Sequence, residues 1–387
     1  MLETVIILIL VLALGYSNHR IAVRWEMPLS VKWLLQGLLL YHLIFTAVFT
    51  YYILDRGGDA TAYWTLSTNV MPAPSDRWGD HFGLSTWFVQ WLNFVPYKLL
   101  GFSFYTGNIL YGLMGFMGIR FLFLLAYDSY VRYIPARVQL YPLLIFFLPN
   151  LHFWTAGIGK EALTLFALAG FLYGIHFFRR WWWLGMLSWA MLFLVRPHIG
   201  FLAVALLLPV LLLFSRFTYK IKLAIMLGLG GLLVLLGPLL VTYLNIPDFS
   251  WSSFRDLMSF QIDFLQHGGS SVDLASYNQG QRLLTYLFRP FFFDAYHWES
   301  YLASAENAVY AVSILLFIYY FNWGALRRMP LYLAIGLLLF LVTTVLFANS
   351  LSNLGIMMRM KSFTMIFMVM GGVYMVVSAL YDTKKRL

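Results

Sequence analysis

The sequence predicts an all-α, polytopic integral membrane protein. Of the 387 residues, 61% are hydrophobic and only 11% are charged, whereas a soluble domain carries about 25% charged residues. The apolar residues come in long, nearly uncharged blocks, and a membrane helix needs roughly 17–25 such residues. The chain also has no cysteine, which excludes disulfides and thiol chemistry. These observations exclude a soluble enzyme, a disordered protein and a nucleic-acid-binding module.

The apolar blocks predict about eleven membrane-spanning helices. They cover residues 2–17, 33–54, 104–126, 138–155, 161–178, 182–196, 199–215, 222–244, 305–321, 329–348 and 362–381. The first block lacks the basic start and the cleavage site of a signal peptide, so we interpret it as a span. The stretch from Val138 to Phe178 fits either two spans or a broken hairpin. Residues 85–100 are apolar but contain Pro96 and Lys98, which favours an interfacial or re-entrant helix.

The distribution of lysine and arginine predicts the orientation. With the N-terminus outside and the C-terminus in the cytoplasm, the inner connections carry fifteen cations, opposed by Glu26, Asp128 and Asp382. Cytoplasmic loops are enriched in these cations, so the net charge of +10 reflects orientation. The fifteen are Arg20, Arg24, Lys32, Arg132, Arg137, Arg179, Arg180, Arg216, Lys220, Lys222, Arg327, Arg328, Lys384, Lys385 and Arg386.

This orientation leaves two long outer loops, at about 55–103 and 245–304, in a single integral membrane domain that covers residues 1–387. No loop is long enough for a soluble domain of about 100–150 residues. We therefore expect the function to lie in the membrane and to open to the outer face.

The first candidate site is the turn Asp55-Arg56-Gly57-Gly58-Asp59, at the outer end of the second span. Two carboxylates four residues apart can supply a base and an orienting partner. The same residues also fit a helix-ending glycine followed by Asp59 as a helix N-cap.

Two short connections carry further candidates. Lys160 and Glu161 interrupt about forty apolar residues, and ionisable groups at membrane depth mark functional sites. Arg196-Pro197-His198 places a guanidinium beside a helix break, and that planar group suits phosphate or carboxylate. Plain turns with interfacial cations are the alternative for both.

The late part of the chain adds three cations. Arg289 precedes a proline and an aromatic run in the second outer loop, and Arg359 and Lys361 lie at the outer start of the last span. Within the same loop, residues 266–271 predict a flexible hinge. The acids and histidines of the loop are interpreted as surface groups: Asp256, Asp263, His267, Asp273, Asp294, His297 and Glu299. The loop also contains Arg255, Tyr277 and Arg282.

Five of these cations suit a lipid-embedded ligand that carries one or two phosphates. Arg196, Arg289 and Arg359 supply guanidinium groups, and Lys160 and Lys361 supply point charges. Such cations would stabilise the charge that develops on a departing pyrophosphate. A carboxylate or a histidine would take the proton of an attacking sugar hydroxyl.

The base is then Asp59 as first choice and His198 as second, with Glu161 as a further catalytic candidate. No metal motif is present, so neither a metal nor another cofactor is predicted. His42 and His176 are interpreted as packed polar residues.

The chain resembles the polytopic enzymes of bacterial surface-polysaccharide assembly: Wzy-type repeat-unit polymerases, the EpsG-like group and the related GT-C glycosyltransferases. The residues that carry the resemblance are Gly57-Gly58-Asp59-Ala60 with Tyr63, Pro149 to Trp154, Gly159-Lys160-Glu161, Arg196-Pro197-His198 and Arg359. It implies a polyprenyl-linked glycan as substrate, the bacterial cytoplasmic membrane as location, and membrane-protein partners in polysaccharide assembly.

Three other functions stay open. A transporter or lipid flippase would show two similar halves, and no sequence repeat is seen. A non-catalytic subunit of an assembly complex would need no converging cations. A membrane acyltransferase would place a histidine beside an aspartate deep in a span, and His42 has no such neighbour in sequence.

Overall fold

The computed structural model describes residues 2–67, 75–214, 218–266, 270–295 and 298–381. Within these ranges the regular secondary structure is helical, apart from an isolated antiparallel bridge between Ser271 and Asn353. Six helices in the described ranges are long and apolar enough to cross a membrane, or up to eight if each of two bent pairs is one span. The predicted class, a helical membrane protein, is confirmed.

The long apolar helices agree with predicted spans apart from their ends. They are α1 (Leu2–Arg24), α2 (Leu29–Arg56), α5 (Phe104–Ser129), α11 (Tyr219–Leu244), α14 (Trp298–Tyr319) and α16 (Leu331–Ala348). The two bent pairs are α7 (Pro149–Thr155) with α8 (Lys160–His176), at 110°, and α17 (Leu354–Lys361) with α18 (Met365–Tyr381), at 52°.

Residues 138–155, predicted either as a span or as part of a broken hairpin, do not form one continuous helix. These residues form α6 (Leu140–Leu143), a 3-10 turn and then α7. Proline lacks a backbone N–H and clashes with the preceding turn, and Pro149 begins α7 while Leu148 before it is extended. A count of eleven continuous helices is therefore not confirmed.

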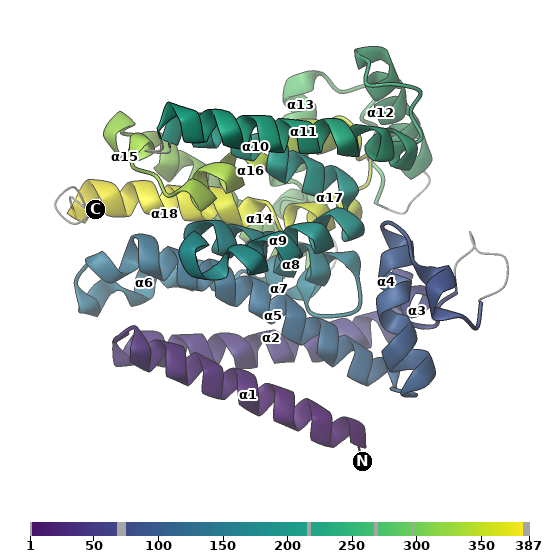
Figure 1. Cartoon of the computed structure of the whole chain (residues 1–387), viewed down its shortest axis with the longest axis horizontal. Coiled ribbons are helices and arrows are strands. Elements are labelled where there is room, and N and C mark those ends of the chain that lie inside the picture. Colours follow the sequence, from purple (N-terminus) through teal and green to yellow (C-terminus); the bar gives the residue numbers. More distant parts are fainter. Residues whose placement is uncertain (1, 68–74, 215–217, 267–269, 296–297, 382–387) are drawn as a thin grey trace. The chain divides into compact units, whose positions relative to one another are not determined.

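The chain divides into two compact units, Met1–Arg196 and Pro197–Asp382. In unit 1, α8 packs against α5 and against α9 (Phe178–Val195), while α2 packs against α1, α5 and α7. Figure 1 shows α1 and α2 side by side, in purple. Small residues let α5 come close to its neighbours: a Cβ on Gly115 would lie 1.9 Å from the Thr155 carbonyl oxygen.

The first predicted outer loop of unit 1 contains α3 (Asp59–Trp64), a 3-10 turn, α4 (Thr86–Asn93) and a π-helical turn at Phe94–Leu99. Residues 86–99 are thus helical, as predicted. Their interfacial or re-entrant placement stays a prediction.

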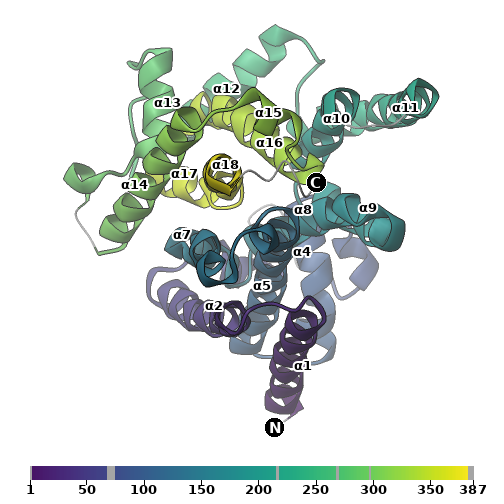
Figure 2. The same ribbon diagram turned by 90° about the vertical axis from the view of Figure 1, so that its left-hand side faces the viewer.

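In unit 2, α10 (Pro197–Phe214) packs against α11 and α16, and α18 packs against α14 and α16. Figure 2 shows α18 end-on, beside α14 and α17. The remaining helices are α12 (Trp251–Leu265), α13 (Gln279–Phe288) and α15 (Trp323–Arg327). The predicted hinge falls largely on residues 267–269, outside the described ranges, as does His297.

Candidate functional site

The break between α7 and α8 is closely packed against α2 and α5 in unit 1. A Cβ on Gly157 would lie 2.2 Å from the Phe49 ring, so only glycine fits there. The backbone N–H of Ile158 donates to Asn108 Oδ1 on α5, over 2.9 Å. The break is therefore a fixed feature that sets the start of α8 at Lys160.

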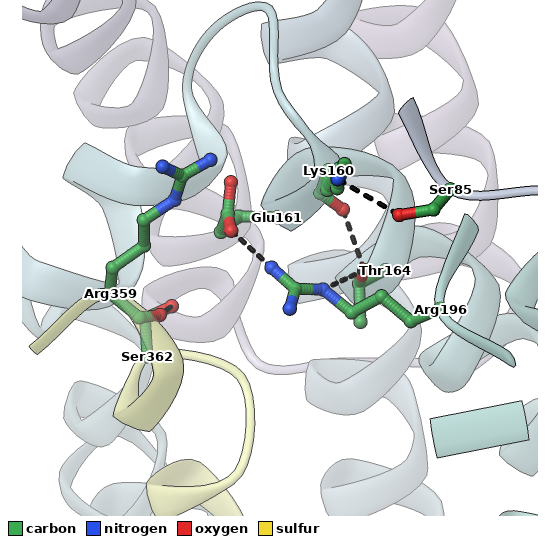
Figure 3. Close-up of polar contacts among 7 residues, drawn as sticks. All are labelled: Ser85, Lys160, Glu161, Thr164, Arg196, Arg359 and Ser362. Atoms are coloured by element: carbon green, nitrogen blue, oxygen red, sulfur yellow. Dashed lines mark hydrogen bonds and ion pairs between the residues drawn. The ribbon is translucent and has the colours of Figure 1, made fainter. Parts of the chain in front are cut away.

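A buried ion pair lies directly after this break. Glu161 is 2% exposed and Arg196 8% exposed, and Arg196 Nη2 donates to the Glu161 carboxylate, as Figure 3 shows. Arg196 Nε also donates to Thr164 Oγ1 over 3.1 Å. Because α8 and α9 form an antiparallel hairpin, the end of α9 lies beside the start of α8. The guanidinium is thus held by two groups on one helix.

Lys160 is half-buried and is held by residues from two other segments. Its Nζ donates to Ser85 Oγ over 2.9 Å and lies 5.7 Å from the centroid of the Tyr63 ring. A cation over an aromatic face is attracted by the ring quadrupole. Tyr63 belongs to α3, the helix that starts at Asp59. The structure therefore brings three sequence-predicted regions of unit 1 next to one another.

Asp59 is exposed and is the first residue of α3. The N-cap position is taken by Gly58 (φ 145°), so the interpretation of Asp59 as the cap is wrong by one residue. Gly57 (φ 77°) ends α2 as expected, with its N–H bonded to the Ile53 carbonyl. Asp59 instead lies in the first helical turn, where the helix dipole favours a carboxylate.

Arg289 in unit 2 has a carboxylate partner of its own. Its Nη2 and Nε donate to the two carboxylate oxygens of Asp294, over 2.8 and 3.0 Å. Burial alone would raise the pKa of Asp294, but the hydrogen bonds from Arg289 and the Phe291 amide, together with the charge of Arg289, outweigh it and lower that pKa. The hydrogen bonds from Arg289 to Asp294 in turn raise the pKa of Arg289. The pair closes the turn that follows α13.

Lys361 is fully buried and braces the same turn. Its Nζ donates to the Arg289 carbonyl over 3.0 Å and to Asn307 Oδ1 over 2.9 Å. Asn307 in turn donates to the Pro290 carbonyl. These contacts tie the turn to α14 and α17.

The other candidates of unit 2 lie on two helices. Arg359 is half-buried on α17, and its carbonyl accepts a hydrogen bond from Ser362 Oγ, shown in Figure 3. His198 is half-buried on α10, with its ring parallel to Tyr243 at 6.3 Å between centroids. Of the five predicted cations, Lys160 and Arg196 thus belong to unit 1 and the other three to unit 2, and their convergence on a single ligand stays a prediction.

Sequence reasoning missed several of the buried partners. His42 Nδ1 lies 2.8 Å from His152 Nδ1, and both rings are fully buried. Glu306 is 2% exposed on α14 and accepts a hydrogen bond from Tyr310. Each of these ionisable residues lies in an apolar block, and that signal marks sites at membrane depth.

Within the described ranges, no three side chains of metal-binding type come together. A search of protein-family models, of curated proteins and of solved structures found nothing that matches this chain.

Proposed function

We propose that this protein is a membrane-embedded glycosyltransferase or polysaccharide polymerase. Its substrate is a glycan linked to polyprenyl phosphate or pyrophosphate, at the outer face of the bacterial cytoplasmic membrane. The observation that carries the proposal is the cluster after the α7–α8 break, where Lys160 and Arg196 flank one carboxylate, Glu161. A guanidinium and an ammonium held close together at such a break can bind the oxygens of an anionic ligand.

The fixed positions of these cations suit catalysis as well as binding. Arg196 is oriented by Glu161 and Thr164, and Lys160 by Ser85. Charges that are already in place need no reorganisation when a pyrophosphate leaves, and such preorganised groups lower the barrier. The anomeric carbon of the donor sugar would lose its bond to the pyrophosphate oxygen and form a bond to the oxygen of the acceptor hydroxyl.

We assign different roles to the two carboxylates in unit 1. Glu161 accepts from Arg196, which supports an orienting role. Asp59 is exposed and begins α3, the helix that carries Tyr63. This supports Asp59 as the group that takes the proton of the acceptor hydroxyl. His198 remains the second choice.

The orientation and the count of eleven spans belong to this proposal, and so do membrane-protein partners in polysaccharide assembly. They rest on the lysine and arginine distribution and on the resemblance of the short motifs.

A lipid flippase is the second candidate, and a specific observation favours it. Each unit contains one bent helix pair, α7–α8 and α17–α18, with cations beside the bend. Discontinuous helices in both halves are a feature of transporters. A transferase and a flippase would both bind the phosphate of a polyprenyl lipid. A binding experiment therefore tests the site, and a second experiment must distinguish the two functions.

The first experiment measures binding of geranylgeranyl pyrophosphate to the purified protein in lipid nanodiscs. Arg196→Lys should weaken binding by roughly ten-fold or more, because a point charge cannot replace charge-assisted hydrogen bonds from a planar group. Arg20→Lys, at an exposed site on α1, is the matched control and should bind normally. Unchanged binding by a folded Arg196→Lys variant would refute the phosphate site.

The second part tests for chemistry. The lipid-linked oligosaccharide fraction of cells that naturally produce the protein is incubated with it in detergent micelles, which have no two sides. A transferase should release polyprenyl pyrophosphate, whereas a flippase should release none. Asp59→Asn should lower the release rate by roughly 10²–10⁴-fold if Asp59 is the base.

A further inference from the structure

Ser85 has a backbone conformation that ordinarily belongs to glycine. Its φ is 62° and its ψ is −116°. A side chain at this φ is disfavoured by clashes with the backbone, and glycine avoids them. Residues held in such conformations cluster at functional sites. Ser85 is one of four non-glycine residues with positive φ in the described ranges; the others are Glu26, Leu66 and Asn245.

Two contacts tie this residue to the candidate site. The Ser85 backbone N–H donates to the Leu194 carbonyl over 2.7 Å, two residues before Arg196. The Ser85 hydroxyl accepts from Lys160 Nζ over 2.9 Å. Ser85 therefore links the end of α9 with the start of α8. In sequence it lies between the candidate sites at residues 55–59 and 160–161.

The Ser85 hydroxyl helps to fix the position of the Lys160 ammonium. A lysine side chain is long and flexible, so its ammonium is placed only by contacts at its tip. Those contacts include the Ser85 hydroxyl and the Tyr63 ring. Glycine at position 85 would relax the backbone but remove the hydroxyl.

We propose that Ser85 is a positioning residue of the phosphate site, and that it acts by fixing the ammonium of Lys160. This inference rests on the proposed function, since it assumes that Lys160 binds the phosphate of the polyprenyl substrate. The backbone conformation at Ser85 places the hydroxyl within hydrogen-bond distance of the Lys160 ammonium.

The test is a double-mutant cycle in the geranylgeranyl pyrophosphate binding assay. Ser85→Gly should weaken binding by roughly ten-fold, the worth of a hydrogen bond to a charged group. In a Lys160→Gln background, Ser85→Gly should cause no further loss, because the group that it positions is gone. Ser85→Ala, which keeps the backbone strain, should behave as Ser85→Gly does.

Glu26→Gly is the matched control, since it also places glycine at a positive φ in unit 1 (50°) and should bind normally. Normal binding by Ser85→Gly, or an equal loss in both backgrounds, would refute the positioning role. Normal binding by Lys160→Gln alone would also refute the positioning role, whereas normal binding by Arg196→Lys would refute the phosphate site itself. Ser85→Gly removes strain, so its folding, checked by size-exclusion chromatography, should be intact.

Discussion

Each of the two best-defined arginines is held by a carboxylate, but the two pairs are built differently. Arg289 and Asp294 are five residues apart in one turn. Arg196 and Glu161 are 35 residues apart and meet because two helices form a hairpin. Both members of the second pair are buried, and removal of one partner from such a pair is strongly destabilising. Arginine-to-lysine variants therefore probe the site more safely than alanine variants.

The Arg289–Asp294 pair predicts loss of stability in acid. The pKa of Asp294 is lower in the folded protein, so its contribution is complete above the unfolded pKa of about 3.9 and is lost as pH falls through the folded value. The unfolding temperature should fall below about pH 4, and Asp294→Asn should reduce this fall. Scanning fluorimetry of the detergent-solubilised protein from pH 6 to pH 3 measures both.

Asp263→Asn, at an exposed position on α12, is the control and should keep the acid sensitivity of the unchanged protein. An Asp294→Asn variant whose unfolding temperature falls as steeply as that of the unchanged protein would show that the pair contributes nothing to acid sensitivity.

At the residue scale, sequence alone indicated which cations to examine but not their partners. Lys160 and Arg196 were predicted because charges inside apolar blocks are costly. The Ser85 contact could not be predicted, since it depends on one residue in a conformation that its side chain disfavours. Whether the two cation groups share a ligand stays a prediction.

At the element scale, glycines on α5 decide how closely the broken segment packs. At Gly112, Gly115 and Gly118 an added Cβ would meet backbone atoms of the α7–α8 segment within 2.8 Å. Backbone atoms cannot rotate away as a flexible side chain can. Sequence reasoning allowed a broken hairpin here but not its packing, because three small residues within one helix fit many partners.

Gly115→Ala should therefore destabilise unit 1. The new Cβ would lie 1.9 Å from the Thr155 carbonyl oxygen, and overpacking of this kind costs about 1–3 kcal/mol. Gly37→Ala on α2 is the matched control, because a Cβ there meets nothing within 4 Å. We expect a lower unfolding temperature for the first variant and no decrease for the second. Equal unfolding temperatures would show that α5 and α7 are less closely packed than described.

At the scale of the whole molecule, composition was enough to predict the class but not the number of spans. Hydropathy averages over a window, so it does not distinguish one long helix from short helical pieces such as those at residues 140–155. The α7–α8 and α17–α18 bends lie beside Lys160 and Lys361, where charged residues interrupt the apolar sequence. Counting apolar blocks therefore gives more long helices than the described ranges contain, which are six, or up to eight if each bent pair is one span.

The orientation gives the last prediction. Reporter fusions after Arg180 and Arg328 should be cytoplasmic, and a fusion at residues 255–266 should be external, because the cationic connections face inward. Alkaline phosphatase and green fluorescent protein fusions measure the two sides. A cytoplasmic signal from residues 255–266 would invert the topology and place the phosphate site on the wrong face for an external polymer.

The hydrogen bond between Asn108 and Ile158 sets an order for biogenesis. In hydrocarbon a backbone N–H without a partner costs several kcal/mol. The partner of Ile158 lies on α5, which leaves the ribosome 50 residues earlier. The acceptor is therefore synthesised before the amide that needs it. A circularly permuted chain that begins at Pro149 would reverse this order, so that the amide is made before its acceptor.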